Sequence, residues 1–190
     1  MIRIGIIGDI GSGKSFVAKS FGYPVFNADQ EVSKLYKNNR KIYRSLNKLI
    51  PKYIVSFPID KKEISNAILV NQVNLKKIIK IVHKEIRKKM NLFLTKNKNK
   101  KVIILDIPLL LENKINNKKD FLVFVEAQKS KIKKRIKKRA NFNSKLFKKF
   151  KKIQLPIDYK KRKANFIIKN DFTKKSVKTG IKEILDEINK

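Results

Sequence analysis

A glycine-rich octapeptide near the start of the chain has the residue types and spacing of a phosphate-binding loop. Gly8-Asp9-Ile10-Gly11-Ser12-Gly13-Lys14-Ser15 fits the pattern G-x-x-x-x-G-K-[ST] at every fixed position. Glycines let the backbone curl so that successive N–H groups converge on polyphosphate oxygens. In this pattern the lysine reaches the β- and γ-phosphates, and the hydroxyl after it binds the bridging Mg²⁺. The motif predicts a nucleoside triphosphate site but does not choose between kinase, ATPase and GTPase.

Such a loop has to join a buried strand to a helix, and both are predicted. Residues 2–7 (IRIGII) form a short apolar run typical of a buried strand, and residues 14–21 place apolar side chains on one helical face. Asp9 lies inside the motif. Because a carboxylate beside a triphosphate is electrostatically unfavourable, we expect Asp9 to face solvent.

The rest of the chain alternates apolar runs with helical patterns. Continuous apolar runs predict buried strands of a parallel sheet at residues 23–26, 101–106, 121–126 and 165–168. Three- and four-residue spacing predicts helices over about 30–99, with a helix start at Asp60 and Glu63, and over 129–154 and 173–189. The fold class is therefore α/β: a P-loop NTPase-like parallel sheet flanked by helices, in one domain of 190 residues.

Composition limits the kind of protein. The chain has no cysteine, which excludes disulfides and thiolate metal sites and favours the cytoplasm, and no apolar stretch is long enough to span a membrane. The net charge is +34, from 49 Lys and Arg against 15 Asp and Glu. Nucleic-acid binding is one interpretation. Compositional drift is the other, and we favour it because the basic residues are spread over the whole chain.

The small size favours a small-molecule kinase over a motor or a helicase. Six blocks follow one another along the chain: IGIIGDIGSGKS, Asn27-Ala28-Asp29, residues 81–84 (IVHK), residues 106–112 (DIPLLLE), Arg135 with Arg139, and Gln154, Pro156, Lys160, Ala164 and Asn170. In order and approximate spacing they resemble the dephospho-CoA kinase family from end to end. The corresponding family blocks after the phosphate loop are D-A-D, I-V-H-P, D-I-P-L-L-F-E, R-x-x-x-R and a closing element.

The resemblance implies phosphorylation of the ribose 3′-hydroxyl of dephospho-CoA, the small-molecule acceptor, with ATP and Mg²⁺ as cofactors, giving CoA and ADP. It implies a core of residues 1–29, 100–128 and 164–190, a helical acceptor-binding insertion at about 30–99 and a helical lid at about 129–155. We expect a monomer that binds neither a specific nucleic acid nor a membrane. The implied catalytic residues are Asp29, Lys14 and Arg139; the ATP-binding residues are Gly8, Gly11, Ser12, Gly13, Lys14, Ser15, Phe16, Arg135 and Asn170; the acceptor-binding residues are Asp29, His83, Asp106, Leu109 and Leu110; and the metal-binding residues are Ser15 and Asp106.

Each side-chain assignment has a plainer alternative. Asp29 could be only the N-cap of a helix that starts at Gln30, and Asp106 only a turn-forming residue before a proline. Arg135 and Arg139, four apart, would share a helix face that could simply be solvated. Residues 109–111 could be ordinary core leucines, and His83 an exposed or packed histidine. The chain also departs from the family pattern, because Asn27, Lys84 and Asn165 replace aspartate, proline and aspartate, and Asp171 stands where a small residue is usual.

Overall fold

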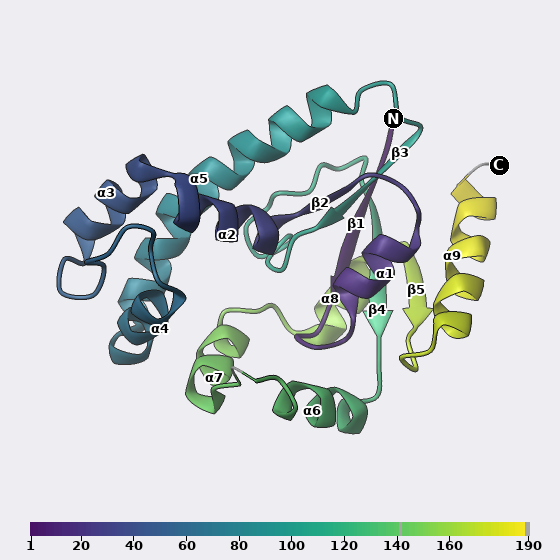
Figure 1. Ribbon diagram of the computed structural model, residues 1–190. Coiled ribbons are helices and arrows are strands. Elements are labelled where there is room, and N and C mark those ends of the chain that lie inside the picture. Colours follow the sequence, from purple (N-terminus) through teal and green to yellow (C-terminus); the bar gives the residue numbers. More distant parts are fainter. Residues whose placement is uncertain (141, 189–190) are drawn as a thin grey trace. The chain divides into compact units, whose positions relative to one another are not determined.

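The computed structural model describes residues 1–140 and 142–188, whose strands form one parallel sheet (Figure 1). The strands are β1 (Ile2–Gly8), β2 (Val25–Asn27), β3 (Val102–Asp106), β4 (Phe121–Glu126) and β5 (Phe166–Lys169), in the order β2-β3-β1-β4-β5. All five predicted strands are found, with ends shifted by up to two residues. Since β1 is central, the phosphate-loop motif leaves the sheet at its middle.

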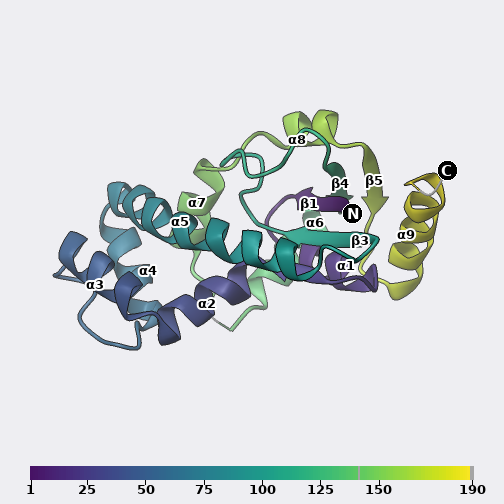
Figure 2. The same cartoon turned by 90° about the horizontal axis from the view of Figure 1, so that it is seen from above.

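Helices cover both faces of this sheet, which explains why the strands read as continuous apolar runs. Helices α1 (Lys14–Ser20) and α9 (Lys174–Ile188) pack on one face, and α8 (Ile157–Lys163) lies on the other (Figure 2). Helix α6 (Lys129–Lys137) follows β4. The core under α1 and α9 comprises Ile4, Ile6, Val17, Ala18, Phe21, Val102, Ile104, Val123, Val125, Ile168, Val177, Ile181 and Ile184.

The residues separate into two compact units, of which the first contains the sheet. Unit 1 is residues 1–27, 97–142 and 153–190, and unit 2 is residues 28–96 and 143–152. Unit 2 is helical, with α2 (Ala28–Asn38), α3 (Arg40–Leu49), α4 (Lys61–Val70), α5 (Gln72–Lys96) and α7 (Ser144–Lys152). Helices α2, α3 and α4 pack against α5, and α7 packs against α4. As predicted, Asp60 caps α4, since its carboxylate accepts a hydrogen bond from the Lys62 amide at 2.8 Å.

Two expectations about the helices were wrong, and one helix was missed. The helix expected over 129–154 is interrupted after Lys137, and its two parts, α6 and α7, fall in different units. Helix α8 was not predicted. Helix α2 begins at Ala28, two residues before the expected start at Gln30.

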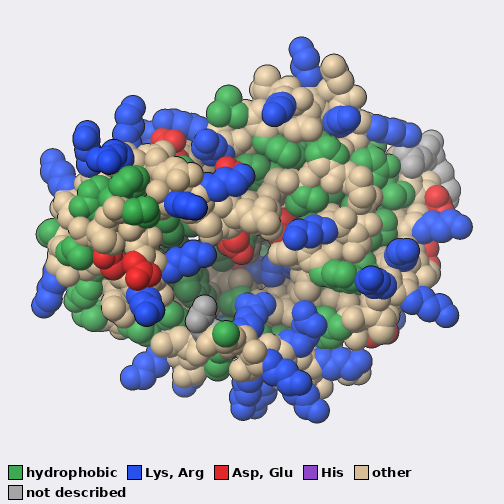
Figure 3. Space-filling model, in the orientation of Figure 1, with side chains coloured by type: hydrophobic (Ala, Val, Ile, Leu, Met, Phe, Trp, Pro, Cys, Tyr) green, Lys and Arg blue, Asp and Glu red, His purple; other side chains and the backbone are tan. Residues whose placement is uncertain are grey.

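Basic side chains spread over the face of the molecule that Figure 3 shows. Figure 3 shows Lys and Arg across the visible face of both units, interspersed with apolar and acidic groups. Compositional drift as the origin of this charge stays a prediction. Within residues 1–140 and 142–188, no helix has the length and apolarity that crossing a bilayer requires.

Candidate functional site: a phosphate-binding loop braced by two neighbours

The glycine-rich loop has the backbone that its sequence predicts. Gly11 and Gly13 have φ angles of 84° and 94°, in the left-handed region that favours glycine, and Gly13 caps the start of α1. Within residues 1–140 and 142–188, the amides of Gly11, Gly13 and Ser15 find no hydrogen-bond acceptor. These donors are the groups that a polyphosphate needs.

Asn170, at the end of β5, braces this loop from one side. Its Nδ2 donates a 2.8 Å hydrogen bond to the Ser12 carbonyl, and its Oδ1 accepts one of 2.9 Å from the Phe172 amide. A Cβ added to Gly13 would lie 2.3 Å from that same Nδ2, so only glycine leaves room for the brace. Asn170 thus fixes the shape of the loop from within the fold.

Helix α6 braces the loop from another side. A Cβ added to Gly11 would lie 2.7 Å from Ile136 Cδ1 and 3.2 Å from Ile132 Cγ2. Both isoleucines are buried, and they are the apolar residues of this otherwise polar and basic helix. The packing of α6 therefore depends on a loop residue without a side chain.

Lys14 lies over the loop, with its Nζ donating to the carbonyls of Gly8 at 3.3 Å and Asp9 at 2.7 Å. The expectation that Asp9 faces solvent was wrong. Asp9 is only 9% exposed, and its Oδ1 accepts a 2.7 Å hydrogen bond from the Ile10 amide. This carboxylate turns back onto its own loop, where a backbone donor offsets part of the cost of burial. Ser15 and Phe16, at the start of α1, are exposed.

Asp106 ends β3 beside the end of β2. The parallel register aligns Asn27 with Asp106, and Asn27 Nδ2 donates to Asp106 Oδ2 at 2.6 Å. Asp106 is 3% exposed, and within the described residues its carboxylate bonds to this neighbouring strand and not to the turn before Pro108. The turn-forming alternative is therefore wrong. Asn27, a departure from the family pattern, donates a hydrogen bond where an aspartate would bring a second negative charge.

Asp29 comes two residues after Asn27, the last residue of β2. It is exposed and is the second residue of α2, with its carbonyl accepting a bond from Ser33 Oγ. Because α2 starts at Ala28, Asp29 is not the N-cap. A carboxylate in the first helical turn is still favourable toward the helix dipole.

The other acceptor-side residues lie in different surroundings. Leu110 is 1% exposed and packs on β1, where a Cβ added to Gly5 would lie 2.6 Å from its Cδ2. Leu109 is half-buried in the same segment after β3. His83 is half-buried on α5, in unit 2. Burial of Leu110 is what the core alternative predicts, and contact of these residues with an acceptor stays a prediction.

The two arginines do not share a helix face, as the sequence led us to expect. Arg135 is on α6, whereas Arg139 follows its end and the Arg139 carbonyl accepts a bond from the Phe142 amide. The Arg135 guanidinium lies 4.3 Å from the centroid of the Phe172 ring. Sequence reasoning missed Phe172. Its only local signal was its position two residues after Asn170, which is the last residue of the closing element of the family pattern.

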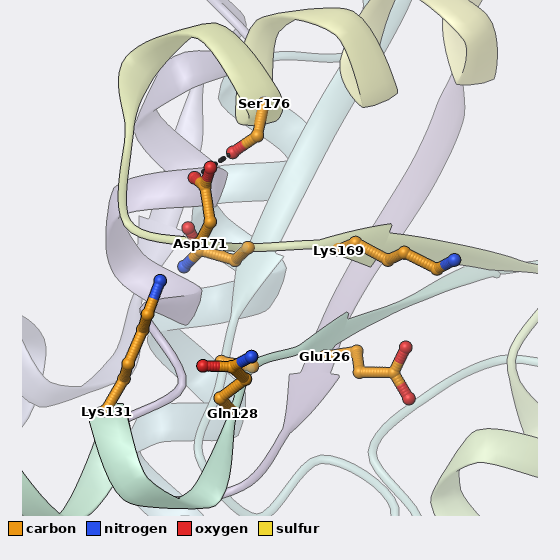
Figure 4. A pocket seen from close by; sticks show the side chains of 8 residues that line it. Glu126, Gln128, Lys131, Lys169, Asp171 and Ser176 are labelled. Atoms are coloured by element: carbon orange, nitrogen blue, oxygen red, sulfur yellow. Dashed lines mark hydrogen bonds between the residues drawn. The ribbon is translucent and has the colours of Figure 1, made fainter.

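An open hollow of about 540 Å³ lies at the carboxyl ends of β4 and β5 (Figure 4). Its lining comes from β4, β5 and the starts of α6 and α9: Glu126, Ala127, Gln128, Lys131, Lys169, Asn170, Asp171 and Ser176. The Ser176 hydroxyl donates to Asp171 Oδ1, and this bond, with that from the Thr173 amide, lowers the pKa of Asp171 to about 2. Figure 4 shows the Lys131 ammonium extending toward Asp171. Asn170 both lines this hollow and donates the hydrogen bond to the Ser12 carbonyl of the phosphate loop.

A five-stranded parallel sheet whose central strand runs into a G-x-x-x-x-G-K-S loop, with an aspartate at the end of the adjacent strand, defines a P-loop kinase. The family model described as "Dephospho-CoA kinase" matches residues 2–176. The chain belongs to the dephospho-CoA kinase family, whose members are transferases that catalyse the last step of CoA biosynthesis.

Curated relatives agree over almost the whole chain. Proteins named dephospho-CoA kinase from Wolbachia sp. subsp. Brugia malayi (strain TRS) and from Wolbachia pipientis wMel are 33% and 34% identical over 191 aligned positions. Each match covers 98% of this chain and 97% of the relative. The relatives therefore match the chain in extent as well as in sequence.

Solved structures have the same fold. TT1252 from Thermus thermophilus matches with a TM-score of 0.78 and 25% identity, covering 98% of this chain and 97% of that one. The dephospho-CoA kinase from Campylobacter jejuni matches with a TM-score of 0.65 at 23% identity, covering 98% and 96%. A shikimate kinase from Bacteroides thetaiotaomicron, at a TM-score of 0.52 and 11% identity, covers 100% and 99%. The architecture is thus that of P-loop kinases in general.

Proposed function

We propose that this chain transfers the γ-phosphoryl group of ATP to the ribose 3′-hydroxyl of dephospho-CoA. A bond forms between the 3′ oxygen and the γ-phosphorus while the bond from that phosphorus to the β,γ-bridging oxygen breaks, leaving CoA and ADP. The observation that carries the proposal is the glycine loop, whose free amides and left-handed glycines fit a polyphosphate. Family membership over residues 2–176 selects the acceptor.

The donor side is built from one region of unit 1. In this proposal Gly8, Gly11, Ser12, Gly13, Lys14, Ser15 and Phe16 surround the phosphates, and the amides of Gly11, Gly13 and Ser15, unbonded among the described residues, are the backbone donors. The ammonium of Lys14, already over the loop, neutralises the β- and γ-phosphates. Arg135 and Arg139 add guanidinium charge. The hollow beside Asn170 is open enough to take the nucleoside part of ATP.

The residues present fit Mg²⁺. Within residues 1–140 and 142–188, no group of three acidic or histidine side chains could hold a metal ion unaided. Mg²⁺ in kinases commonly takes one or two protein oxygens together with phosphate oxygens and water. The Ser15 hydroxyl and the Asp106 carboxylate supply that number, and the bound ion would neutralise charge on the phosphates.

Asp29 is the proposed general base on the acceptor side. It follows the carboxyl end of β2, which is the neighbour of β3 in the sheet. Ligands of parallel α/β folds bind outside the carboxyl ends of the strands. As an exposed carboxylate it can accept the proton of an alcohol. Asp106, held by Asn27, together with Leu109, Leu110 and His83 would form the remainder of the acceptor site, with residues 30–99 as the acceptor-binding insertion and 129–155 as the lid.

We further propose that the enzyme is a cytoplasmic monomer without a specific nucleic-acid partner. The absence of cysteine supports the cytoplasmic location, and the dispersed basic charge supports the lack of a specific nucleic-acid partner. Gel filtration with light scattering checks the oligomeric state, and a dimer would refute it.

Acceptor-dependent ADP release tests the function. With ATP and Mg²⁺, dephospho-CoA should stimulate ADP formation, whereas nucleosides and nucleoside monophosphates should not. Lys14→Ala should abolish transfer. Stimulation by a nucleoside monophosphate alone would identify another nucleotide kinase. Salt-sensitive binding to DNA or RNA without any stimulated ADP release would identify a nucleic-acid-binding protein.

Asp29→Asn tests the base. We expect kcat to fall by about 10²- to 10⁴-fold, because a general base contributes that much, with the Kd for ATP nearly unchanged. Glu31→Gln is the matched control, since Glu31 is also in the first turn of α2 and pairs with Lys34 on the surface. Substantial turnover by Asp29→Asn would remove Asp29 from the catalytic role.

A further inference from the structure

Phe172 has a backbone conformation that an aromatic residue rarely adopts. Its φ is 74°, in the left-handed region, where only Lys114 joins it among the non-glycine residues that the structure describes. Bulky side chains there are outliers, and such outliers persist where the surroundings fix them. Here the Phe172 amide donates to Asn170 Oδ1 at 2.9 Å. The residue that braces the phosphate loop therefore also fixes Phe172.

The ring of Phe172 lies between the loop and α6. Its Cε1 would be 3.5 Å from a Cβ added to Gly13, which places one ring edge against the loop. The guanidinium carbon of Arg135 is 4.3 Å from the ring centroid, within the range of a cation–π contact. One half-buried ring thus touches the phosphate loop and the arginine predicted to contact ATP.

This contact distinguishes Arg135 from its neighbours. The segment around it, residues 131–139, is KIKKRIKKR, in which six other cations surround Arg135. Arg135 is the member of this segment found over an aromatic ring in the described part of the chain. A planar guanidinium stacks on a ring better than an ammonium does, so the ring favours an arginine at this place.

We propose that Phe172 is a positioning residue for ATP, whose ring holds the Arg135 guanidinium beside the phosphate loop before the nucleotide binds. The proposal rests on the proposed function, because it takes Arg135 as an ATP contact. An arginine held in advance loses less side-chain freedom when ATP arrives. The left-handed backbone at Phe172 is the conformation that directs the ring between Gly13 and Arg135.

The test compares Phe172→Leu, Phe172→Gly and Phe172→Tyr with the parent protein in steady-state kinetics and thermal unfolding. Leu and Gly should raise the KM for ATP by about two- to fivefold, which is the strength of an exposed cation–π contact expressed as a binding ratio. The KM for dephospho-CoA should stay unchanged. Tyr, which keeps the ring, should restore the KM for ATP.

Stability separates positioning from a structural role. Glycine accepts a φ of 74° without strain and leucine does not. The Tm of Phe172→Gly should therefore be higher than that of Phe172→Leu, although both variants lose the ring. If the ring only packs, both variants lower Tm and leave the KM for ATP unchanged, which overturns the proposal. Equal rises in KM for ATP and for dephospho-CoA also overturn it, because they indicate general loosening.

A double-mutant cycle with Arg135→Lys supplies the direct test of coupling. In the Phe172→Leu background, Arg135→Lys should raise the KM for ATP less than it does in the parent, because the stack is already lost. Additive effects would show that the two residues act independently and would refute the proposal. The Lys14→Ala variant distinguishes failure of this inference from failure of the proposed function. Turnover by Lys14→Ala contradicts the proposed function itself. If Lys14→Ala is inactive but the Phe172 variants keep the parent KM for ATP, only this inference is contradicted.

Discussion

Substitution of Lys160 should lower the stability of the fold more than substitution at most other positions, although the other residues of its helix are mostly exposed. Lys160 is on α8, and its Nζ lies 2.6 Å from Glu112 Oε1, with side-chain exposures of 2% and 9%. Glu112 Oε1 also accepts a 3.1 Å bond from the Leu155 amide. One carboxylate thus joins the segment after β3 to the chain entering α8. Lys160→Met retains most of the apolar stem but leaves that carboxylate buried beside no cation.

Removing one partner of a buried ion pair costs about 3–5 kcal/mol. For a chain of this size each kcal/mol lowers Tm by about 2–4 °C, so Lys160→Met should lower Tm by about 6–20 °C. Lys161 provides the matched control, since its Nζ is 2.7 Å from Glu126 Oε1 with exposures of 42% and 36%. An exposed pair contributes about 0–1 kcal/mol, so Lys161→Met should lower Tm by at most about 4 °C.

Thermal and urea unfolding, followed by circular dichroism at one ionic strength, measure the difference. Each substitution removes one positive charge from a strongly basic protein, so the effect on overall repulsion cancels in the comparison. Replacing both partners, as Lys160→Met with Glu112→Leu, should recover most of the loss. Equal Tm values for Lys160→Met and Lys161→Met would refute the view that Lys160→Met loses stability because the Glu112 carboxylate is left without its cation. A double variant as unstable as Lys160→Met would refute it too.

Two further predictions concern the loop and the start of α9. Gly13→Ala should lower Tm and weaken ATP binding at least about tenfold, because the methyl group displaces Asn170, whereas Gly22→Ala, with φ of 75° and no atom within 4 Å, should cost only the backbone strain of about 1–2 kcal/mol. Calorimetric binding and unfolding compare the pair, and identical behaviour would contradict the brace. The pKa of Asp171 is lowered to about 2, chiefly by the Ser176 hydroxyl, so its contribution to stability is present above its unfolded pKa and is lost as pH falls toward about 2. Asp171→Ala should therefore be less stable than the parent in urea unfolding at neutral pH, with a gap that narrows below about pH 4; a gap independent of pH would show that the carboxylate charge is not responsible.

The parts of the fold found from sequence are those with a local signal. β3 is buried at every position, and its run of apolar residues has no other ready explanation. The phosphate loop is one continuous segment, and its left-handed backbone at Gly11 and Gly13 favours glycine at these positions. The pairing of β2 with β3 brings Asn27 to Asp106, and it follows only from the register of the sheet. The strands were therefore predictable, but that hydrogen bond was not.

Helix α8 shows why other parts were missed. It has seven residues, and its buried side chain is a lysine, which any analysis of periodicity counts as exposed. Its partner Glu112 is far away in the sequence, so no local pattern reveals the burial. The break after Lys137 is similar: the residues on both sides are basic, and α7 packs on α4 of unit 2. Contacts remote in sequence decide both features.

The division of the chain has a practical consequence for dissecting the enzyme. The polypeptide passes between the units after residues 27, 96, 142 and 152, so unit 1 is assembled from three separate stretches and unit 2 from two. No truncation from either terminus yields an intact nucleotide-binding half, because each cut discards strands or helices that the half requires. A minimal ATP-binding fragment would instead need internal deletions bridged by short linkers.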